Sequence, residues 1–229
     1  MKPAALSVVL LLTGTAGCAA AQPAVPLPAQ SRAAVSSATP APVSTAGEAF
    51  YRALRPGPAA MLTRQPKSLA AAFAESTAVV VAEVTAVTEG RLIGDMQTAV
   101  VDLDVIRVLH GDLQPGLPDT RVEFGVSFLP EPIAPLVGRM HADVPRGPAV
   151  WLLKWQGRPA PDRKPGAPRR DPTADLGLYN IVHYNCAILV DGPDRHVVSA
   201  IAQDGDPFGA QAEAESYPDL DTLIRQRTP

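Results

Sequence analysis

The feature that most constrains the fold is a long β-strand whose side-chain alternation changes phase once. The segment TAVVDLDVIRVLHG, residues 98–111, has apolar residues at odd positions as far as Val105, with Asp102 and Asp104 between them. From Ile106 onward the apolar residues occupy even positions instead. A one-residue slip of this kind is produced by a β-bulge, which bends a strand and exchanges its faces. Long bulged strands occur where a small sheet curls into a barrel.

Shorter apolar segments around this strand predict a mainly antiparallel, all-β fold. TAVVVAEVTAV, residues 77–87, has an apolar residue at every even position and predicts a strand with one fully buried face. The turn sequence DGPDR, residues 191–195, lies between two apolar runs and predicts a hairpin. The other strand candidates are RVEFGVSF (121–128), AVWLLKWQ (149–156) and LYNIVHY (178–184). Six or so strands joined by long loops indicate a barrel or a sandwich.

Helix signals lie only at the two ends of this β-rich region, which we delimit as a single domain at residues 67–229. The segment SLAAAFAES predicts a short helix that begins after Ser68 as its N-cap. Near the end of the chain, PDLDTLIRQR predicts a second helix, for which either Asp219 or Asp221 can act as the cap. The predicted fold is therefore a small, mainly antiparallel β-barrel with short flanking helices.

The first residues of the chain predict export. Residues 1–17 have a positively charged start, an apolar run and small residues before Cys18, which is the layout of a signal peptide. The motif AGC at its end resembles a bacterial lipobox, whose cysteine receives a diacylglyceryl group and becomes the mature N-terminus. This resemblance implies a lipid-anchored protein on the outer face of the cell membrane. The alternative is an ordinary signal cut after the alanines at 19–21, which leaves a secreted, soluble protein.

The segment between the signal and the domain predicts a tether. Residues 18–66 are rich in Ala, Pro, Ser, Thr and Gln and show no sustained period of 2 or 3.6. Such a segment buries too little apolar surface to offset its chain entropy, so we expect it to be disordered. Within it, EAFYRAL at 48–54 has the pattern of one short helical turn, and we expect its apolar side chains to make only transient contacts.

Three apolar motifs carry a resemblance to a known family. They are Val81–Val84 in the first predicted strand, Val108–Asp112 at the end of the second, and Val150–Lys154 in the fourth. Their order resembles that of secreted bacterial lipoproteins, of actinobacterial type, with an OB-like, netrin/TIMP-type β-barrel. The resemblance covers about residues 68–156, and His110 stands where that family usually has Lys. It implies an OB-like barrel in an exported protein and transfers no catalytic residue.

Composition and motifs exclude several function classes. The net charge is −3, which argues against nucleic acid as the main partner because phosphate binding needs a concentrated basic surface. The sequence has no P-loop, Rossmann glycine pattern, G-x-S-x-G elbow or H-E-x-x-H pair. The four histidines lie on separate predicted segments, so their spacing predicts no metal site. We therefore expect no cofactor and no metal.

Two features are candidates for a binding surface. Trp151 and Trp155 lie on one face of a predicted strand, where they form either a stacking platform or part of the core. A Pro-rich loop at 157–176 concentrates positive charge that could contact anionic lipids or wall polymers, or else form a solvated insertion. Its candidate binding residues are Arg163, Lys164, Arg169 and Arg170.

Cys186 is the one candidate nucleophile in the predicted domain. It follows His183 by three residues, and an activated thiol needs a neighbouring base. On a continuous strand, however, positions three apart point to opposite faces, which favours Cys186 as a small buried hydrophobe. The leading hypothesis is a non-enzymatic binding module tethered to the cell envelope, with an envelope protein or a wall polymer as partner. The alternative is an envelope hydrolase or transferase that uses Cys186 with a nearby histidine.

Overall fold

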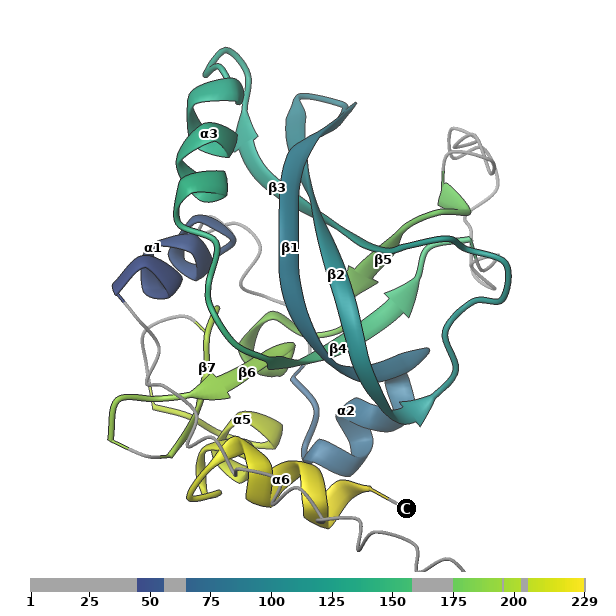
Figure 1. The fold of residues 1–229 in the computed structure, drawn as a ribbon, viewed down its shortest axis with the longest axis vertical. Helices are drawn as coiled ribbons and strands as arrows, with labels where there is room; N and C mark the ends of the chain where they lie inside the picture. The colour runs from purple at the N-terminus through teal and green to yellow at the C-terminus, as the bar shows by residue number, and fades with distance from the viewer. Residues whose placement is uncertain (1–44, 56–64, 158–174, 195, 203–205, 229) are drawn as a thin grey trace, which may run out of the picture. The chain divides into compact units, whose positions relative to one another are not determined.

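A computed structural model describes residues 45–55, 65–157, 175–194, 196–202 and 206–228, all within one compact unit (Figure 1). Its strands are β1 (Ala78–Ile93), β2 (Met96–Gly111), β3 (Thr120–Phe128), β4 (Ala149–Trp155), β5 (Tyr179–Ile181), β6 (Ile188–Asp191) and β7 (Val197–Ser199). Its helices are α1 (Thr45–Ala53), α2 (Leu69–Glu75), α3 (Ala134–Ala142), the 3₁₀ turn η2 (Tyr184–Cys186), α5 (Ala210–Glu215) and α6 (Leu220–Arg227). The chain is sheet-rich with short helices, as the sequence predicts.

The seven strands form one mixed sheet in the order β1-β2-β3-β5-β4-β6-β7. Every pair is antiparallel except β3 with β5, which is parallel at Val122 and Tyr179. Residues 78–82 of β1 pair with the end of β2 on one side and with residues 149–153 of β4 on the other. The strand pairs therefore lead from β1 through β2, β3, β5 and β4 back to β1.

The predicted slip in β2 is confirmed as a β-bulge, although the two apolar residues Ile106 and Val108 do not reach the core. Across from Val81 and Ala82, the partner changes from Arg107 to Val105, which leaves Ile106 as an extra residue. Ile106 and Val108, the apolar residues after the slip, are 58% and 41% exposed. The reason is a second register shift that turns the next residue, Leu109, inward.

Two hydrophobic clusters lie on opposite faces of β1 and β4. One contains Ala78, Val80 and Ala82 of β1, and the other contains Val79 and Val81. Helices α2, α5 and α6 contribute to the second cluster and gather at the end of the sheet where β1, β4 and β6 meet (Figure 1). The uninterrupted apolar run in β1 follows from this arrangement, because a strand covered on both faces has no solvent side.

The folded part begins earlier than the sequence predicts. Residues 48–54, which we assigned to the tether, belong to helix α1 and the turn that follows it. Phe50, Tyr51 and Leu54 are buried in the first cluster rather than making transient contacts. The correction has a simple cause: these side chains lie on one helix face, and burial next to α3 supplies the stabilisation that an isolated turn lacks.

Two other local predictions are wrong: that helices occur only at the ends of the domain, and that a continuous strand leads to Cys186. In each case a proline or a short turn interrupts the alternation. Helix α3 lies between β3 and β4, although helices were expected only at the ends of the domain. It begins with a proline in its first turn, a position where the missing N–H is no loss. The segment before Cys186 is not a continuous strand, because β5 ends at Ile181 and the 3₁₀ turn η2 follows.

Both predicted end helices and the predicted hairpin are confirmed. Ser68 caps α2, and its hydroxyl accepts a hydrogen bond from Ala71 N. Asp219, rather than Asp221, caps α6 by accepting from Thr222 N. Strands β6 and β7 pair antiparallel across the predicted turn. Within the described ranges, no helix has the length and apolar character needed to span a bilayer.

Gly111 has a structural role in the motif Val108–Asp112 at the end of β2. It ends β2 with a φ of +65°, and a Cβ at this position would collide with the carbonyl oxygen of Thr77. The same carbonyl accepts a hydrogen bond of 3.2 Å from Asp112 N. The glycine therefore allows the end of β2 to lie against the start of β1.

Candidate functional site

A groove of about 780 Å³ lies between β2 and the loop that leads to β3. One wall is formed by β1 and β2, and the other by residues 113–121, which include the start of β3. Its volume is in the range of small-ligand sites. The lining residues are Thr85, Thr88, Asp102, Leu103, Asp104, Val105, Leu113, Leu117, Pro118, Asp119, Thr120 and Arg121.

The groove exists because β3 accompanies only half of β2. The last pair between these strands joins Leu103 to Thr120, while β2 continues to Gly111. In the described part of the chain, no strand pairs with residues 104–111 on the side away from β1. The backbone of this half of β2 is therefore a sheet edge, and it borders the groove at Asp104 and Val105.

The loop opposite this edge is held by the core. Gln114 N donates a hydrogen bond of 2.6 Å to the phenolic oxygen of Tyr179 on β5. Burial raises the pKa of Tyr179, so this phenol stays neutral over the physiological range. Leu113 and Leu117 pack against the first hydrophobic cluster. These contacts fix the far wall of the groove at its base.

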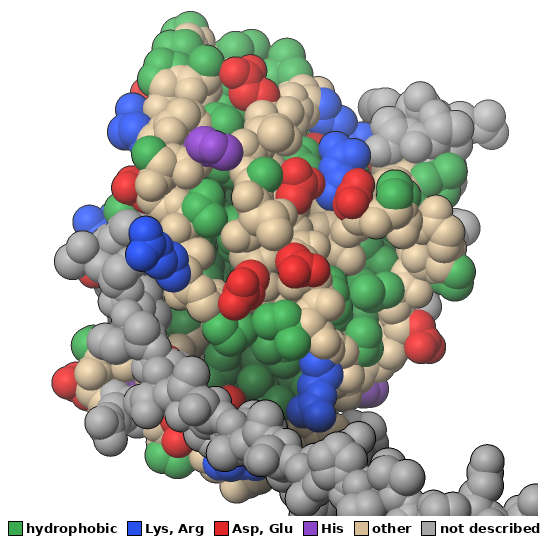
Figure 2. All heavy atoms as spheres, viewed as in Figure 1, with side chains coloured by type: hydrophobic (Ala, Val, Ile, Leu, Met, Phe, Trp, Pro, Cys, Tyr) green, Lys and Arg blue, Asp and Glu red, His purple; other side chains and the backbone are tan. Residues whose placement is uncertain are grey.

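The groove carries more carboxylates than cations. Its lining contains Asp102, Asp104 and Asp119 with one guanidinium, Arg121, so the formal charge of the lining is −2. Arg121 lies directly across from Asp102, and its Nε is 3.6 Å from an Asp102 oxygen. Figure 2 shows acidic side chains gathered on the face over β1 and β2.

Asp104, unlike Asp102, lies across from a residue of like charge. The residue directly across from it on β1 is Glu83, and both side chains are exposed. Like charges at directly opposed positions of a sheet are destabilising. Over the described residues, no ion pair involves Glu83, Asp104 or Asp119. This edge of the sheet therefore presents unneutralised negative charge beside an open groove.

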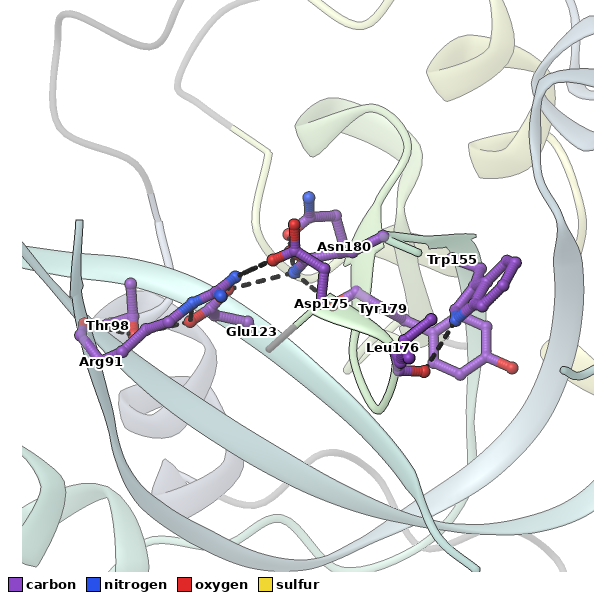
Figure 3. A network of polar contacts seen from close by, with 9 residues as sticks. Arg91, Thr98, Glu123, Trp155, Asp175, Leu176, Tyr179 and Asn180 are labelled. Atoms are coloured by element: carbon purple, nitrogen blue, oxygen red, sulfur yellow. Dashed lines mark hydrogen bonds and ion pairs between the residues drawn. The ribbon is translucent and has the colours of Figure 1, made fainter. Parts of the chain in front are cut away.

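A second polar cluster, centred on Arg91, lies toward the β1–β2 hairpin (Figure 3). Arg91 donates to both oxygens of Glu123, from Nε at 2.9 Å and from a terminal nitrogen at 2.8 Å. The same terminal nitrogen lies 2.6 Å from an oxygen of Asp175. Glu123 also accepts from Thr98 at 3.0 Å and from Gln156 at 3.2 Å. The hydrogen bond with Glu123 raises the pKa of the Arg91 guanidinium further above its ordinary value.

This Arg91 cluster joins β1, β2 and β3 to the residues that flank β4 and β5. Glu123 is only 5% exposed, although it alternates with the apolar Val122 and Phe124 along β3. A buried carboxylate needs a cation and hydrogen bonds, and Arg91, Thr98 and Gln156 supply them. The chain itself supplies donors to both oxygens of Glu123 and to one oxygen of Asp175, so we assign the cluster a structural role.

The two tryptophans do not form a common surface. Trp151 is 0% exposed and packs edge-on against Phe124 in the first cluster, at a centroid distance of 6.4 Å. It therefore belongs to the core and is not available for stacking on a ligand. Trp155 is partly buried against the same cluster, and its Nε1 donates to the carbonyl of Leu176 at 2.9 Å.

The remaining predicted surface and anchor residues lie outside the described ranges. These are the anchor Cys18 and the four basic residues Arg163, Lys164, Arg169 and Arg170.

Cys186 lies in η2 and is buried, with 1% exposure. Burial, with a smaller contribution from the charge of Glu75, raises the pKa of its thiol to about 12. The Nε2 of His183 lies 2.8 Å from a Glu75 oxygen, while its Nδ1 is buried without a hydrogen-bond partner. The thiol is therefore not bonded to the imidazole, and neither its protonation nor its exposure is that of a nucleophile.

Among the described residues, no three or more His, Cys, Asp or Glu side chains are grouped so that they could hold a metal ion. The carboxylates of the groove are thus spread along its walls rather than converging on a point.

Comparison with protein-family models, curated proteins and solved structures finds no match. The assignment of a site to this chain therefore depends on its geometry and charge. The sequence alone did not reveal the groove, because Asp102 and Asp104 read as ordinary solvent-facing positions of an alternating strand. The length difference between the second and third strands would have been the only available signal.

Removing the cation of the Arg91 cluster should destabilise the fold. In Arg91→Ala, the carboxylates of Glu123 and Asp175 stay buried without their positive partner, so we expect a loss of about 2–4 kcal/mol in the free energy of unfolding. Urea unfolding followed by circular dichroism measures it. The matched control is Arg52→Ala, which breaks an exposed i,i+4 pair with Glu48 and should cost about 0.5 kcal/mol or less. Equal small losses for both variants would contradict the structural role.

The thiol of Cys186 should react slowly in the folded protein. In a Cys18→Ser chain it is the sole cysteine, and its buried, protonated state predicts labelling by iodoacetamide at pH 7.4 about a hundredfold slower than in urea. Mass spectrometry of quenched samples gives both rates. Rapid labelling of the folded chain would instead favour the hypothesis of a Cys186 nucleophile.

Proposed function

We propose that this chain is a non-enzymatic binding module tethered to the cell envelope, and that its ligand occupies the groove beside β2. The observation that carries the proposal is the open groove next to a sheet edge with unneutralised carboxylates. Sequences that break a local rule without compensation tend to do so at functional sites. The opposed pair of Glu83 and Asp104 is such a conflict, and a bound cationic group would relieve it.

The proposed scaffold is an OB-like β-barrel. The support for it is the circuit of pairs through β1, β2, β3, β5 and β4, which is what closure of five strands requires. The bulges in β1 and β2 add the bending that such closure needs. Strands β6 and β7 extend the sheet beyond the circuit and carry the cover of α5 and α6.

The proposed location is the outer face of the cell membrane. Lipidation of Cys18 would anchor the chain there, and the Pro-rich residues before α1 would serve as the spacer. The ligand of a module held in this way would be an envelope protein or a wall polymer rather than nucleic acid. The negative charge of the groove selects a ligand with positively charged groups.

The proposal predicts a partner that is captured from the groove and lost with the anchor. A photoreactive amino acid in place of Thr88, which is an exposed wall residue, should crosslink the full chain to an envelope component in bacterial cells. The double substitution Asp104→Asn with Asp119→Asn should weaken that adduct, since it removes two of the three carboxylates of the lining. Cys18→Ser should move the protein from the membrane fraction to the soluble fraction and abolish the adduct.

The control is the photoreactive residue at position 131, an exposed site in the loop after β3 that does not line the groove. Adducts of equal yield from positions 88 and 131, or an adduct from position 88 that persists after both aspartates are neutralised, would contradict a site in the groove. Membrane retention of Cys18→Ser would contradict the lipid anchor.

A further inference from the structure

Residues 104–108 of β2 combine three properties that are rarely found together on a sheet edge. They have no strand partner on one side among the described residues, and at Asp104 and Val105 they border an open groove. They also include Ile106 and Val108, whose apolar side chains are exposed. Natural proteins usually cover such an edge, because its free N–H and C=O groups pair readily with another chain.

The far wall leaves space at this edge rather than covering it. The loop opposite is held by Gln114 and by the packing of Leu113 and Leu117, and the groove of about 780 Å³ lies between that loop and the edge. A strand added to a sheet lies about 4.8 Å from its neighbour. The edge borders the groove at Asp104 and Val105, and residues 106–108 beyond it are exposed. One extended segment can therefore lie along residues 104–108, with its main-chain groups facing β2.

We infer that the ligand of the groove is an extended, basic peptide segment that adds to β2 as a further strand. This inference rests on the function proposed above and names the class of its partner. In strand addition, main-chain hydrogen bonds supply affinity, and alternate side chains supply specificity. Here one set of alternate side chains would lie next to Asp104, whose carboxylate already faces Glu83 on the β1 side, so that set is Lys or Arg.

Charge favours a basic peptide strand over three other possible occupants: an acidic or neutral strand, a second copy of this chain and a free polyamine. An acidic or neutral strand would leave the opposed carboxylates unneutralised, whereas a basic strand pairs with them. A second copy of this chain would bring its own Asp104 and Glu83 to the same edge together with a single nearby cation, Arg107. A free polyamine would satisfy the charge and leave the backbone of the edge unpaired.

The test uses the nine-residue peptide acetyl-KVKVKVKVK-amide and the full-length chain, with binding measured by isothermal titration calorimetry. Residues of a strand alternate in which edge their N–H faces. We therefore compare the peptide N-methylated on three internal valines with the peptide N-methylated on three internal lysines. One of these two should bind about tenfold or more weakly than the parent, and the other should bind about as well, because only one set of N–H groups faces β2.

Three further measurements complete the test. The peptide acetyl-EVEVEVEVE-amide should not bind. Asp104→Asn should raise the Kd of the lysine peptide about threefold or more, whereas Glu131→Gln, an exposed control outside the groove, should leave it unchanged. Sedimentation velocity should show that the chain stays monomeric at the concentrations used.

Several results would overturn the inference. Equal binding of both N-methylated peptides, or competition by spermidine at equal charge, would mean that charge alone is recognised. A dimer that excludes the peptide would assign the edge to a second copy. Failure of the lysine peptide while the groove still yields its specific adduct in cells would refute strand addition and leave the binding module standing. Loss of the adduct as well would refute both.

Discussion

The double pairing of the first five residues of β1 is the constraint on which the rest of the structure depends. These residues bond to β2 on one side and to β4 on the other, and they are buried on both faces. Because β4 occupies the other edge of β1, the end of β2 has β1 as its strand partner on one side and, among the described residues, no strand on the other. Strand β3 begins at Thr120, across from Leu103, and pairs with β5 on its other edge, so the remaining half of β2 is left as an edge. The groove is thus a consequence of strand lengths and not of a separate insertion.

Acidic side chains have opposite environments at two places along β1 and β2. Toward the hairpin, the carboxylates of Glu123 and Asp175 are buried and share the guanidinium of Arg91. At the groove, Glu83 and Asp104 oppose each other in the open, with no cation between them among the described residues. A chain that buries acidic groups around a shared cation at one place and leaves them opposed without one at another favours function over stability at the second. The proposed basic ligand completes the pairing that the fold omits.

The sequence predicted what depends on local pattern, and it missed what depends on tertiary contacts. The alternation of β1 and β4, the bulge at Ile106, the caps at Ser68 and Asp219 and the β6–β7 hairpin all follow from neighbouring residues. Helix α1 was missed because its stability comes from burial against the core rather than from propensity. The burial of Glu123 could not be predicted, because alternation does not reveal a distant arginine. The groove could not be predicted from the sequence, because no pattern within β2 shows where its pairing with β3 ends.

The most direct test of the account is amide hydrogen exchange, measured by NMR on the full-length chain without ligand. If the edge is unpaired, amides of residues 104–108 that point away from β1 should exchange at rates typical of loops, while those that point toward β1 are protected. Residues 99–103, which lie between β1 and β3, should be protected on both sides. Equal protection of both sets within 104–108 would show that another part of the molecule already covers the edge, and would contradict the account.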